Sequence, residues 1–577
     1  MQDKSKGIIK ELFFLIKKLT KRRRIQLASI IVLSFFSAIF EIISLAALIP
    51  FLEILNDNGS SFNEPIINNF IVILKDYSGN DFSYYLTLIF VGITILSGFF
   101  RFILLWIQTR VTHLIGADIS VMIYSKSLYQ PYSSHIKKNS SDIISSISTK
   151  VDRLVRDSLV NVLLVISSGL MSVSLICFLF YIEPVVALGS FGSFGFIYLV
   201  IILLSKKFLK RDSKAINYYQ NLVFKALSEG FGGIKDIIIN RSQEVFINKY
   251  RSSDIPMRRA HANIAIIGGA PRFALEALGF TTFALIAFIL KINGYSGAET
   301  TSILALFAIS SMKIIPLLQQ IYAGISGISG SRFFLYDIND FLSLEIHDPK
   351  NIKQINFNSE IKIDNVSFRF SKNDEWILKD FSMIIPSGKM VGIIGSTGSG
   401  KSTLLNIIMG LLTPNVGNLE IDNELIDENL VLSWRKKIAY VPQEIFLNDS
   451  SIYENIALGV DLNEIDHDRV KKVSKSAMIY NDIISWSDGF KTKVGERGVN
   501  ISGGQKQRIG LARALYRQPE LLILDEATSA LDYKTEREVM KAVESLSKNL
   551  TVIIVAHRLE TLKNCDTIIE LNNDNVK

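Results

Sequence analysis

One run of eight residues, Gly395–Ser402, has the order of glycine, hydroxyl and lysine side chains that encloses phosphate groups. It follows a strand-like apolar run at 390–394 and precedes a helix-compatible run, as a phosphate-binding loop should. Its glycines let backbone N–H groups approach phosphate oxygens, Lys401 offers charge to the β and γ phosphates, and the Ser402 hydroxyl is a ligand for Mg²⁺. The predicted nucleotide contacts are Gly395, Ser396, Thr397, Gly398, Ser399, Gly400, Lys401, Ser402 and Thr403.

Two adjacent carboxylates, Asp525 and Glu526, end a second apolar run at 521–524. Such a run suits a buried parallel strand, and ligands bind at the carboxyl ends of parallel strands. We expect Asp525 to hold Mg²⁺ and Glu526 to polarise the attacking water, because phosphoryl transfer depends on positioning and charge stabilisation. The two patterns together predict hydrolysis of a nucleoside triphosphate.

A third motif, Ile501–Gln505, resembles the signature of the ABC (ATP-binding cassette) ATPase family, with isoleucine in place of the common leucine. The start of the following helix-compatible run presents N–H groups of Ser502, Gly503, Gly504 and Gln505 as a receptor for a γ-phosphate. The resemblance implies that this receptor serves the nucleotide held by a second ATPase domain. Because the sequence contains one such domain, the resemblance implies a homodimer that encloses two ATP molecules.

Other motifs of the family follow in the family's order: Gln443 in 441–443, Asp532 in 529–532 and His557 in 556–558. The resemblance implies that Gln443 senses Mg²⁺ at the catalytic centre and that His557 contacts the γ-phosphate. It also implies that Asp532 contacts the opposite site. Phe370 matches the position that stacks on adenine, where the family usually has tyrosine, and stacking needs only the face of the ring.

The residues before the ATPase motifs carry long apolar stretches, in a chain of 577 residues that is too long for one hydrophobic core. A membrane span needs roughly 20 mostly apolar helical residues. The stretches that meet this length lie at 25–54, 84–113, 158–181, 184–206, 264–290 and 299–327. Six such runs with few internal charges predict six membrane spans rather than buried helices of a soluble protein.

Basic residues at 17–24 precede the first predicted span and others at 206–211 follow the fourth, which places both ends of the span region in the cytoplasm. These flanks account for much of the net charge of +8, so binding of nucleic acid is not expected. Two cysteines exclude a disulfide framework. The polar stretches 114–157 and 207–263 are predicted to be helical extensions into the cytoplasm, interrupted near Pro131 and Gly232–Gly233.

Six spans followed by one ATPase domain resemble a half-transporter of the ABC exporter family, and a motif at 492–498 is associated with exporters rather than importers. The resemblance implies an α-helical type I exporter transmembrane domain at 1–340 and an α/β phosphate-loop ATPase domain at 341–577. It further implies a protein of the bacterial inner membrane, with its N-terminus and ATPase domain in the cytoplasm.

Three cations, Arg101, Arg272 and Lys313, interrupt predicted spans, where a charge is costly unless it is paired or faces water. Two interpretations stay open: the cations pair with Glu41 and Glu276, or they bind an anionic substrate. The sequence at 270–280, with an apolar stretch at 66–77 that is either an external surface helix or a connecting helix, resembles bacterial flippases of lipid-linked oligosaccharides. That resemblance implies a pyrophosphate-bearing substrate, which basic residues suit.

The alternative functions share the ATPase motifs and differ in what the membrane part does. An exporter of another lipid, a drug or a peptide would need a different cavity chemistry. An ATP-gated channel or regulatory subunit would use ATP without uphill transport, and a soluble DNA-associated ATPase would not need membrane spans.

Overall fold

The computed structural model describes residues 7–48, 51, 82–137, 140–182, 184–292, 294, 297–346, 353–495, 498, 501–527, 533–546, 550–556 and 562–571. Contacts divide the chain into a helical unit of Met1–Gln130 and Lys137–Ile346, and an ATPase unit of Pro131–Ile136 and His347–Lys577. Helices end at both predicted interruptions: α5 ends at Leu128, shortly before Pro131, and α10 ends at Gly232.

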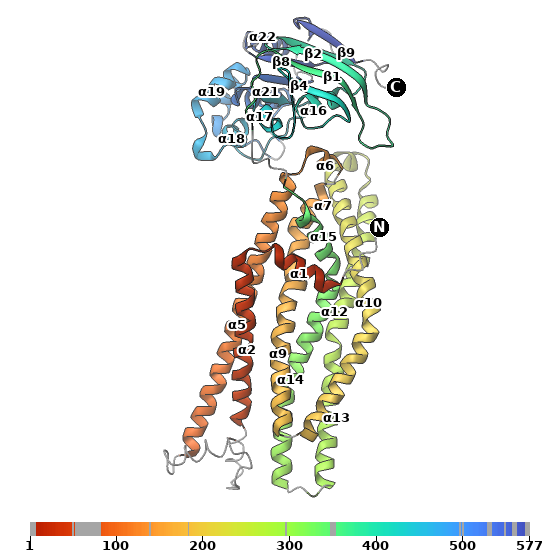
Figure 1. Cartoon of the computed structure of the whole chain (residues 1–577), viewed down its shortest axis with the longest axis vertical. Helices are drawn as coiled ribbons and strands as arrows, with labels where there is room; N and C mark the ends of the chain where they lie inside the picture. Colours follow the sequence, from red (N-terminus) through yellow and green to blue (C-terminus); the bar gives the residue numbers. More distant parts are fainter. Residues whose placement is uncertain are drawn as a thin grey trace. The chain divides into compact units, whose positions relative to one another are not determined.

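The helical unit is built from long helices that run beside one another (Figure 1). They are α1 (Ile8–Lys18), α2 (Lys21–Ala46), α5 (Phe82–Leu128), α9 (Val160–Ile182), α10 (Pro184–Gly232), α12 (Gln243–Gly269), α13 (Pro271–Ile292), α14 (Gly297–Gly330) and α15 (Arg332–Ser343). Shorter pieces are α7 (Ser140–Ser145), a π-helical segment (Ser146–Lys150), α8 (Val151–Arg153), a second π-helical segment (Leu154–Leu159) and α11 (Ile234–Ile239).

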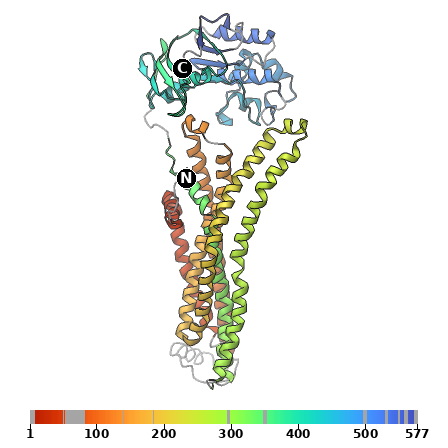
Figure 2. The ribbon, with the colours of Figure 1, turned by 90° about the vertical axis from the view of Figure 1, so that its right-hand side faces the viewer.

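Three of the predicted spans, 84–113, 184–206 and 299–327, lie within α5, α10 and α14. The span 25–54 begins on α2 and runs beyond the described residues, 158–181 covers the end of a π-helical segment and α9, and 264–290 covers the end of α12 and most of α13. Among the described residues, four helical stretches are long and apolar enough to cross a membrane, namely Lys21–Ala46, Ser83–Leu128, Ile143–Ile182 and Gln243–Ile292. The other two predicted spans lie on α10 and α14. Beyond its apolar part α10 continues as a long polar helix that packs against α12 (Figure 2). Residues 114–128 and 207–232 therefore continue α5 and α10, as the helical character predicted for these stretches requires.

Helices α9 and α14 approach each other closely because two glycines of α14 present no side chain. A Cβ atom at Gly324 would lie 2.6 Å from a methyl group of Val165. A Cβ atom at Gly327 would lie 3.2 Å from the carbonyl oxygen of Asp157 and still closer to the side chain of Asn161. A larger residue at either position would clash with these neighbours, so Val165 or Asn161 would have to move.

The ATPase unit contains two sheets. One is antiparallel, with order β2-β1-β4-β5, and the other is parallel, with order β6-β7-β8-β3-β9. The strands are β1 (Glu360–Phe368), β2 (Leu378–Pro386), β3 (Met390–Gly395), β4 (Val416–Ile421), β5 (Glu424–Leu425), β6 (Ile438–Val441), β7 (Leu521–Asp525), β8 (Thr551–Val555) and β9 (Thr567–Leu571).

The ATPase unit also contains helices. They are α6 (Tyr132–Lys137), α16 (Lys401–Ile408), α17 (Val431–Lys436), α18 (Ile452–Ile456), α19 (His467–Ser476), α20 (Tyr480–Ser485), α21 (Gly503–Tyr516) and α22 (Tyr533–Leu546). Trp434 of α17 is fully buried, and its indole N–H donates to the Ile408 carbonyl at the end of α16 at 2.8 Å. This contact fixes α16, which begins at the phosphate-binding loop, to the core.

The apolar runs of the two chemical motifs form central strands of the parallel sheet. Strand β8 lies between β3 and β7 and pairs with both, and all five of its residues are buried. Parallel pairing brings the carboxyl ends of β3 and β7 to the same edge. The loop after β3 and the carboxylates that end β7 therefore face a common site.

Candidate functional site

The loop from β3 into α16 has a backbone that needs glycine at several positions. A Cβ atom at Gly395 would lie 2.7 Å from the Leu571 carbonyl oxygen and 2.6 Å from Ser399 Oγ. Gly398 and Gly400 both have φ of +87°, in the left-handed region that side chains disfavour. Gly400 is the N-cap of α16, so the loop ends where the N–H groups of that helix point outward.

The backbone of this loop holds the side chain of Lys401. Its Nζ donates to the carbonyl oxygens of Gly395 at 2.7 Å and Ser396 at 2.9 Å. Ser402 is exposed, and the next residue, Thr403, is buried. Ser399 Oγ is buried and has no hydrogen-bond partner among the described residues. Buried hydroxyls are normally paired, so the loop fits a ligand that supplies oxygen atoms.

The two carboxylates at the end of β7 have different surroundings. Burial raises the pKa of Asp525, while a hydrogen bond from Tyr440 opposes that rise. The Tyr440 hydroxyl donates to Asp525 Oδ2 at 2.9 Å. Lys401 lies close enough for its charge to lower the pKa of Asp525 as well. The loop lysine and the strand-end carboxylate thus belong to one site.

Glu526 has a left-handed backbone, with φ of +50°, directly after the strand. Its N–H donates to the Val555 carbonyl at 2.9 Å, which ties the bend to the end of β8. Gln443 Nε2 donates to Glu526 Oε2 at 2.6 Å. The structure therefore brings together two residues that the sequence predicted from separate motifs, and this hydrogen bond orients the carboxylate of Glu526.

The donor set fits Mg²⁺, which takes oxygen ligands and binds through one or two protein groups together with substrate phosphates. Ser402, Asp525 and Gln443 each offer an oxygen atom. The described residues contain no group of three or more acidic, histidine or cysteine side chains that could hold a metal. A Mg²⁺ ion bound partly by phosphate oxygens does not need such a group. Bound there, the ion would neutralise charge that develops on the transferred phosphoryl group.

The signature motif forms the beginning of α21. Ser502 is its N-cap, and Ser502 and Gln505 exchange hydrogen bonds between side chains and backbone as a capping box. Asp482 of α20 accepts from Gln505 Nε2 at 3.1 Å and from Arg508 at 3.0 Å, which fixes the direction of the helix. The capping box uses the N–H groups of Ser502 and Gln505. The exposed Gly503 lies at the N-terminus of the helix, where an anion from outside the unit can approach.

The remaining predicted nucleotide contacts are partly described. Phe370 is 36% exposed, and its ring and that of Phe368 are nearly perpendicular, with ring centroids 5.1 Å apart. This arrangement leaves a ring face for stacking. Asp532 and His557 lie outside the described residues, as do parts of the exporter motif at 492–498 and the whole stretch at 66–77.

The predicted membrane cations fall into two groups. Arg101 of α5 and Lys313 of α14 both contact Glu41 of α2, at 3.6 Å and 3.1 Å. Arg272 instead pairs with Glu276, one turn along its own helix, at 2.7 Å. The ion pairs that the sequence allowed are therefore present, and two of the three cations come together.

Sequence reasoning missed Tyr440 and Asp482. Tyr440 lies on β6, paired with Ile523 of β7, and is three residues before Gln443. The closeness of Tyr440 to Gln443 in the sequence was therefore the signal that could have placed it at the site. Asp482 carried no signal, because its role depends on the packing of α20 against the signature helix.

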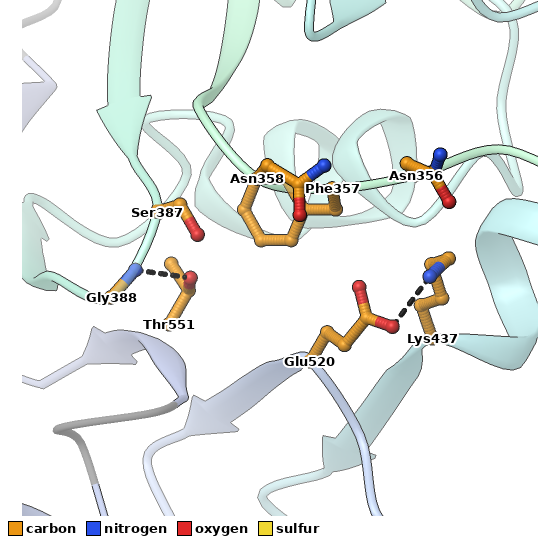
Figure 3. Close-up of a pocket in the computed structure, with 8 residues that line it drawn as sticks. All are labelled: Asn356, Phe357, Asn358, Ser387, Gly388, Lys437, Glu520 and Thr551. Carbon is orange, nitrogen blue, oxygen red and sulfur yellow. Dashed lines mark hydrogen bonds and ion pairs between the residues drawn. The ribbon is translucent and has the colours of Figure 1, made fainter.

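A separate polar crevice of about 310 Å³ lies in the ATPase unit, at the amino ends of the parallel strands (Figure 3). Its lining residues are Asn356, Phe357, Asn358, Ser387, Gly388, Lys437, Glu520 and Thr551. Lys437 and Glu520 form an ion pair, and Thr551 Oγ1 accepts from the Gly388 N–H at 2.9 Å. Because nucleotides bind at the opposite ends of such strands, this crevice is not the phosphate site.

Replacing Glu526 by glutamine should preserve ATP binding and abolish most turnover. Glutamine keeps an oxygen that accepts from Gln443 but cannot accept a proton from the attacking water. A positioned general base contributes about 10²–10⁴-fold to rate. Nucleotide binding and steady-state phosphate release measure the two effects. Glu520→Gln, at the other end of the same strand, is the control that should hydrolyse normally, and undiminished hydrolysis by Glu526→Gln would remove Glu526 from the catalytic role.

Replacing Tyr440 by phenylalanine should make hydrolysis more sensitive to acid. The hydrogen bond from Tyr440 lowers the pKa of Asp525, so its loss in the variant raises that pKa. The acid form is a poorer ligand for a hard cation, so the acid limb of the rate against pH should move to higher pH. Rates across pH, compared with Tyr453→Phe on α18, measure the shift. Parallel profiles for the two variants would exclude this role.

Comparisons with known proteins cover both parts of the chain. A family described as "ABC transporter transmembrane region" matches residues 27–314, and one described as "ABC transporter" matches residues 378–529. An "ATP-dependent lipid A-core flippase" of Francisella novicida is 30% identical over 79% of this chain and 77% of its own length. A protein of the same name from Ralstonia nicotianae is 25% identical over 84% of this chain and 82% of its own length.

A solved structure, "Structure of a bacterial Atm1-family ABC exporter with ATP bound", shares the fold. Its TM-score is 0.76 at 19% sequence identity, over 95% of this chain and 93% of that chain. The chain is thus a membrane protein with a helical transmembrane domain and an ATP-binding ABC domain. Its matched domains and its relatives together place it in the ABC exporter family, as a half-transporter whose ATPase domain drives translocation.

Proposed function

We propose that two copies of this chain form an ATP-driven flippase that moves a lipid-linked, anionic oligosaccharide across the bacterial inner membrane. The observation that carries the substrate proposal is the convergence of Arg101 and Lys313, from two helices, on the single carboxylate of Glu41. The relatives described as lipid A-core flippases support lipid flipping. Basic flanks at 17–24 support a cytoplasmic N-terminus and ATPase domain.

The dimer proposal rests on the two halves of the ATP site. Lys401, Asp525 and Glu526 meet at one edge of the parallel sheet, whereas Ser502 and Gly503 are exposed at the start of α21. By family resemblance, N–H groups at the start of this helix complete the site of a second copy, Asp532 contacts that opposite site, and His557 contacts the γ-phosphate. Closure of two ATPase domains around ATP and Mg²⁺ would then reopen the membrane helices outward, and hydrolysis would reset them.

The substrate proposal rests on charge. A cation in the centre of a membrane span costs about 2.5–3.5 kcal/mol, so such residues persist mainly where they are paired or used. Two cations share Glu41, and 45% of the Arg101 side chain and 26% of the Lys313 side chain remain exposed. Phosphate oxygens are suitable partners for both. Arg272, paired on its own helix, is a weaker candidate for substrate contact.

Export of another lipid, a drug or a peptide uses the same ATPase and is the alternative. An apolar cargo would have no use for the positive charge that remains after Arg101 and Lys313 share Glu41, which favours the anionic substrate. The remaining alternative is an ATP-gated channel or regulatory subunit. Electrical conductance without uphill transport would favour the channel.

Mixed dimers should reveal the shared ATP site. Lys401→Ala damages the loop, and Gly503→Glu places a carboxylate at the phosphate receptor, so dimers of either variant alone should be nearly inactive. A dimer with one copy of each variant has one site with neither defect, because loop and receptor come from different copies. Hydrolysis should therefore return on co-assembly. Failure to recover, or full activity of a single protomer by crosslinking and mass measurement, would contradict the dimer.

Flipping in liposomes tests the cargo. Purified protein with ATP should move a polyprenyl-pyrophosphate oligosaccharide, and should leave a peptide and an ordinary phospholipid in place. Neutralising the cations with Arg101→Gln and Lys313→Gln should lower this transport roughly ten- to hundredfold, the order for losing hydrogen bonds to a charged group, while basal hydrolysis continues.

Arg272→Gln is the matched control, because its cation is paired elsewhere, and its transport should stay near wild type. Movement of ordinary phospholipid alone would defeat the oligosaccharide proposal. Equal transport by the double variant would remove Arg101 and Lys313 from the substrate site.

A further inference from the structure

Glu41 occupies the centre of the charged cluster in the helical unit. Its side chain is 4% exposed, and both carboxylate oxygens are engaged. Ser97 Oγ donates to Oε2 at 2.7 Å, while Lys313 and Arg101 approach Oε1 at 3.1 Å and 3.6 Å. Three helices, α2, α5 and α14, thus supply one anion and its partners (Figure 1).

The charges in this cluster do not balance. Within the described part of the chain, two cations face one carboxylate, which leaves a net charge of +1. Lys313 also donates to Ser44 Oγ at 3.4 Å, a neutral contact that does not change the sum. By contrast, Arg272 and Glu276 neutralise each other. The cluster around Glu41 therefore keeps attraction for an anion even when its internal pairs are formed.

An anionic head group that reaches these cations must share them with Glu41. The carboxylate weakens the positive potential of the site, and the weakening acts more strongly on a head group with more negative charges. It also offers the cations a partner when the head group leaves, so that departure does not expose two unpaired charges in the membrane.

We infer that Glu41 is a specificity-determining counter-ion of the anion site, which sets the affinity for phosphate head groups according to their charge and favours their release. This inference rests on the proposed function, because it assigns the cargo's phosphate to Arg101 and Lys313. Glu41 is a positioning residue for those cations rather than a contact of the cargo.

The test uses the full-length protein in nanodiscs of neutral phospholipid. Hydrolysis is measured while polyprenyl pyrophosphate, polyprenyl monophosphate or neutral polyprenol is added. Glu41→Gln keeps an oxygen for Ser97 and removes the charge. The half-stimulating concentration of the pyrophosphate should fall about tenfold, the order expected for loss of a unit charge a few ångströms away. That of the monophosphate should fall less, polyprenol should act equally on both proteins, and maximal flipping should slow.

Glu276→Gln is the matched control, since its carboxylate serves Arg272, and it should keep the wild-type ratio between the two phosphates. Glu41→Asp retains charge but draws the carboxylate back from the cations, so it should change the ratio in the same direction by less. This variant keeps the test open if Glu41→Gln does not fold.

The possible outcomes separate the two proposals. If the wild-type protein responds to anionic lipids and Glu41→Gln leaves the ratio unchanged, or weakens both lipids equally, the role of Glu41 is wrong and the proposed cargo stands. If the wild-type protein responds to neither anionic lipid, the cargo and the role of Glu41 both fail.

Discussion

The parallel pairing of β8 with β3 on one side and β7 on the other is the constraint on which the ATP site depends. Because of it, a loop and a strand end more than 120 residues apart in sequence open at one edge of the sheet. Parallel pairing therefore turns two local motifs into one site. The hydrogen bond from Gln443 to Glu526 then adds β6, the next strand, to the same edge.

Much of this arrangement follows from the sequence because phosphate chemistry restricts local geometry. Gly395, Gly398 and Gly400 each occupy a place where a side chain would clash or strain the backbone, so their spacing carries a strong signal. Apolar runs of sufficient length similarly predicted the long helices. Such patterns are short-range, and their physical cause lies within a few residues.

The parts that were not predictable depend on packing between distant segments. Nothing near Asp482 in sequence indicates that it holds Gln505 and Arg508 of the signature helix. The same holds for the charged membrane residues: their types indicated pairing or binding, but the choice of partner depended on which helices became neighbours. Lys313 of α14 and Arg101 of α5 both contact Glu41 of α2, whereas Arg272 pairs with Glu276 one turn along the same helix.

The glycine contacts between α14 and α9 have a mechanical consequence. At Gly324 and Gly327 the two helices approach closely, with the side chains of Val165 and Asn161 against the glycines. Pro316 lies between these glycines and Lys313, and a proline inside a helix removes a backbone hydrogen bond. A bend of α14 at Pro316 would leave the glycine-bearing half against α9 and would displace the half that bears the lysine.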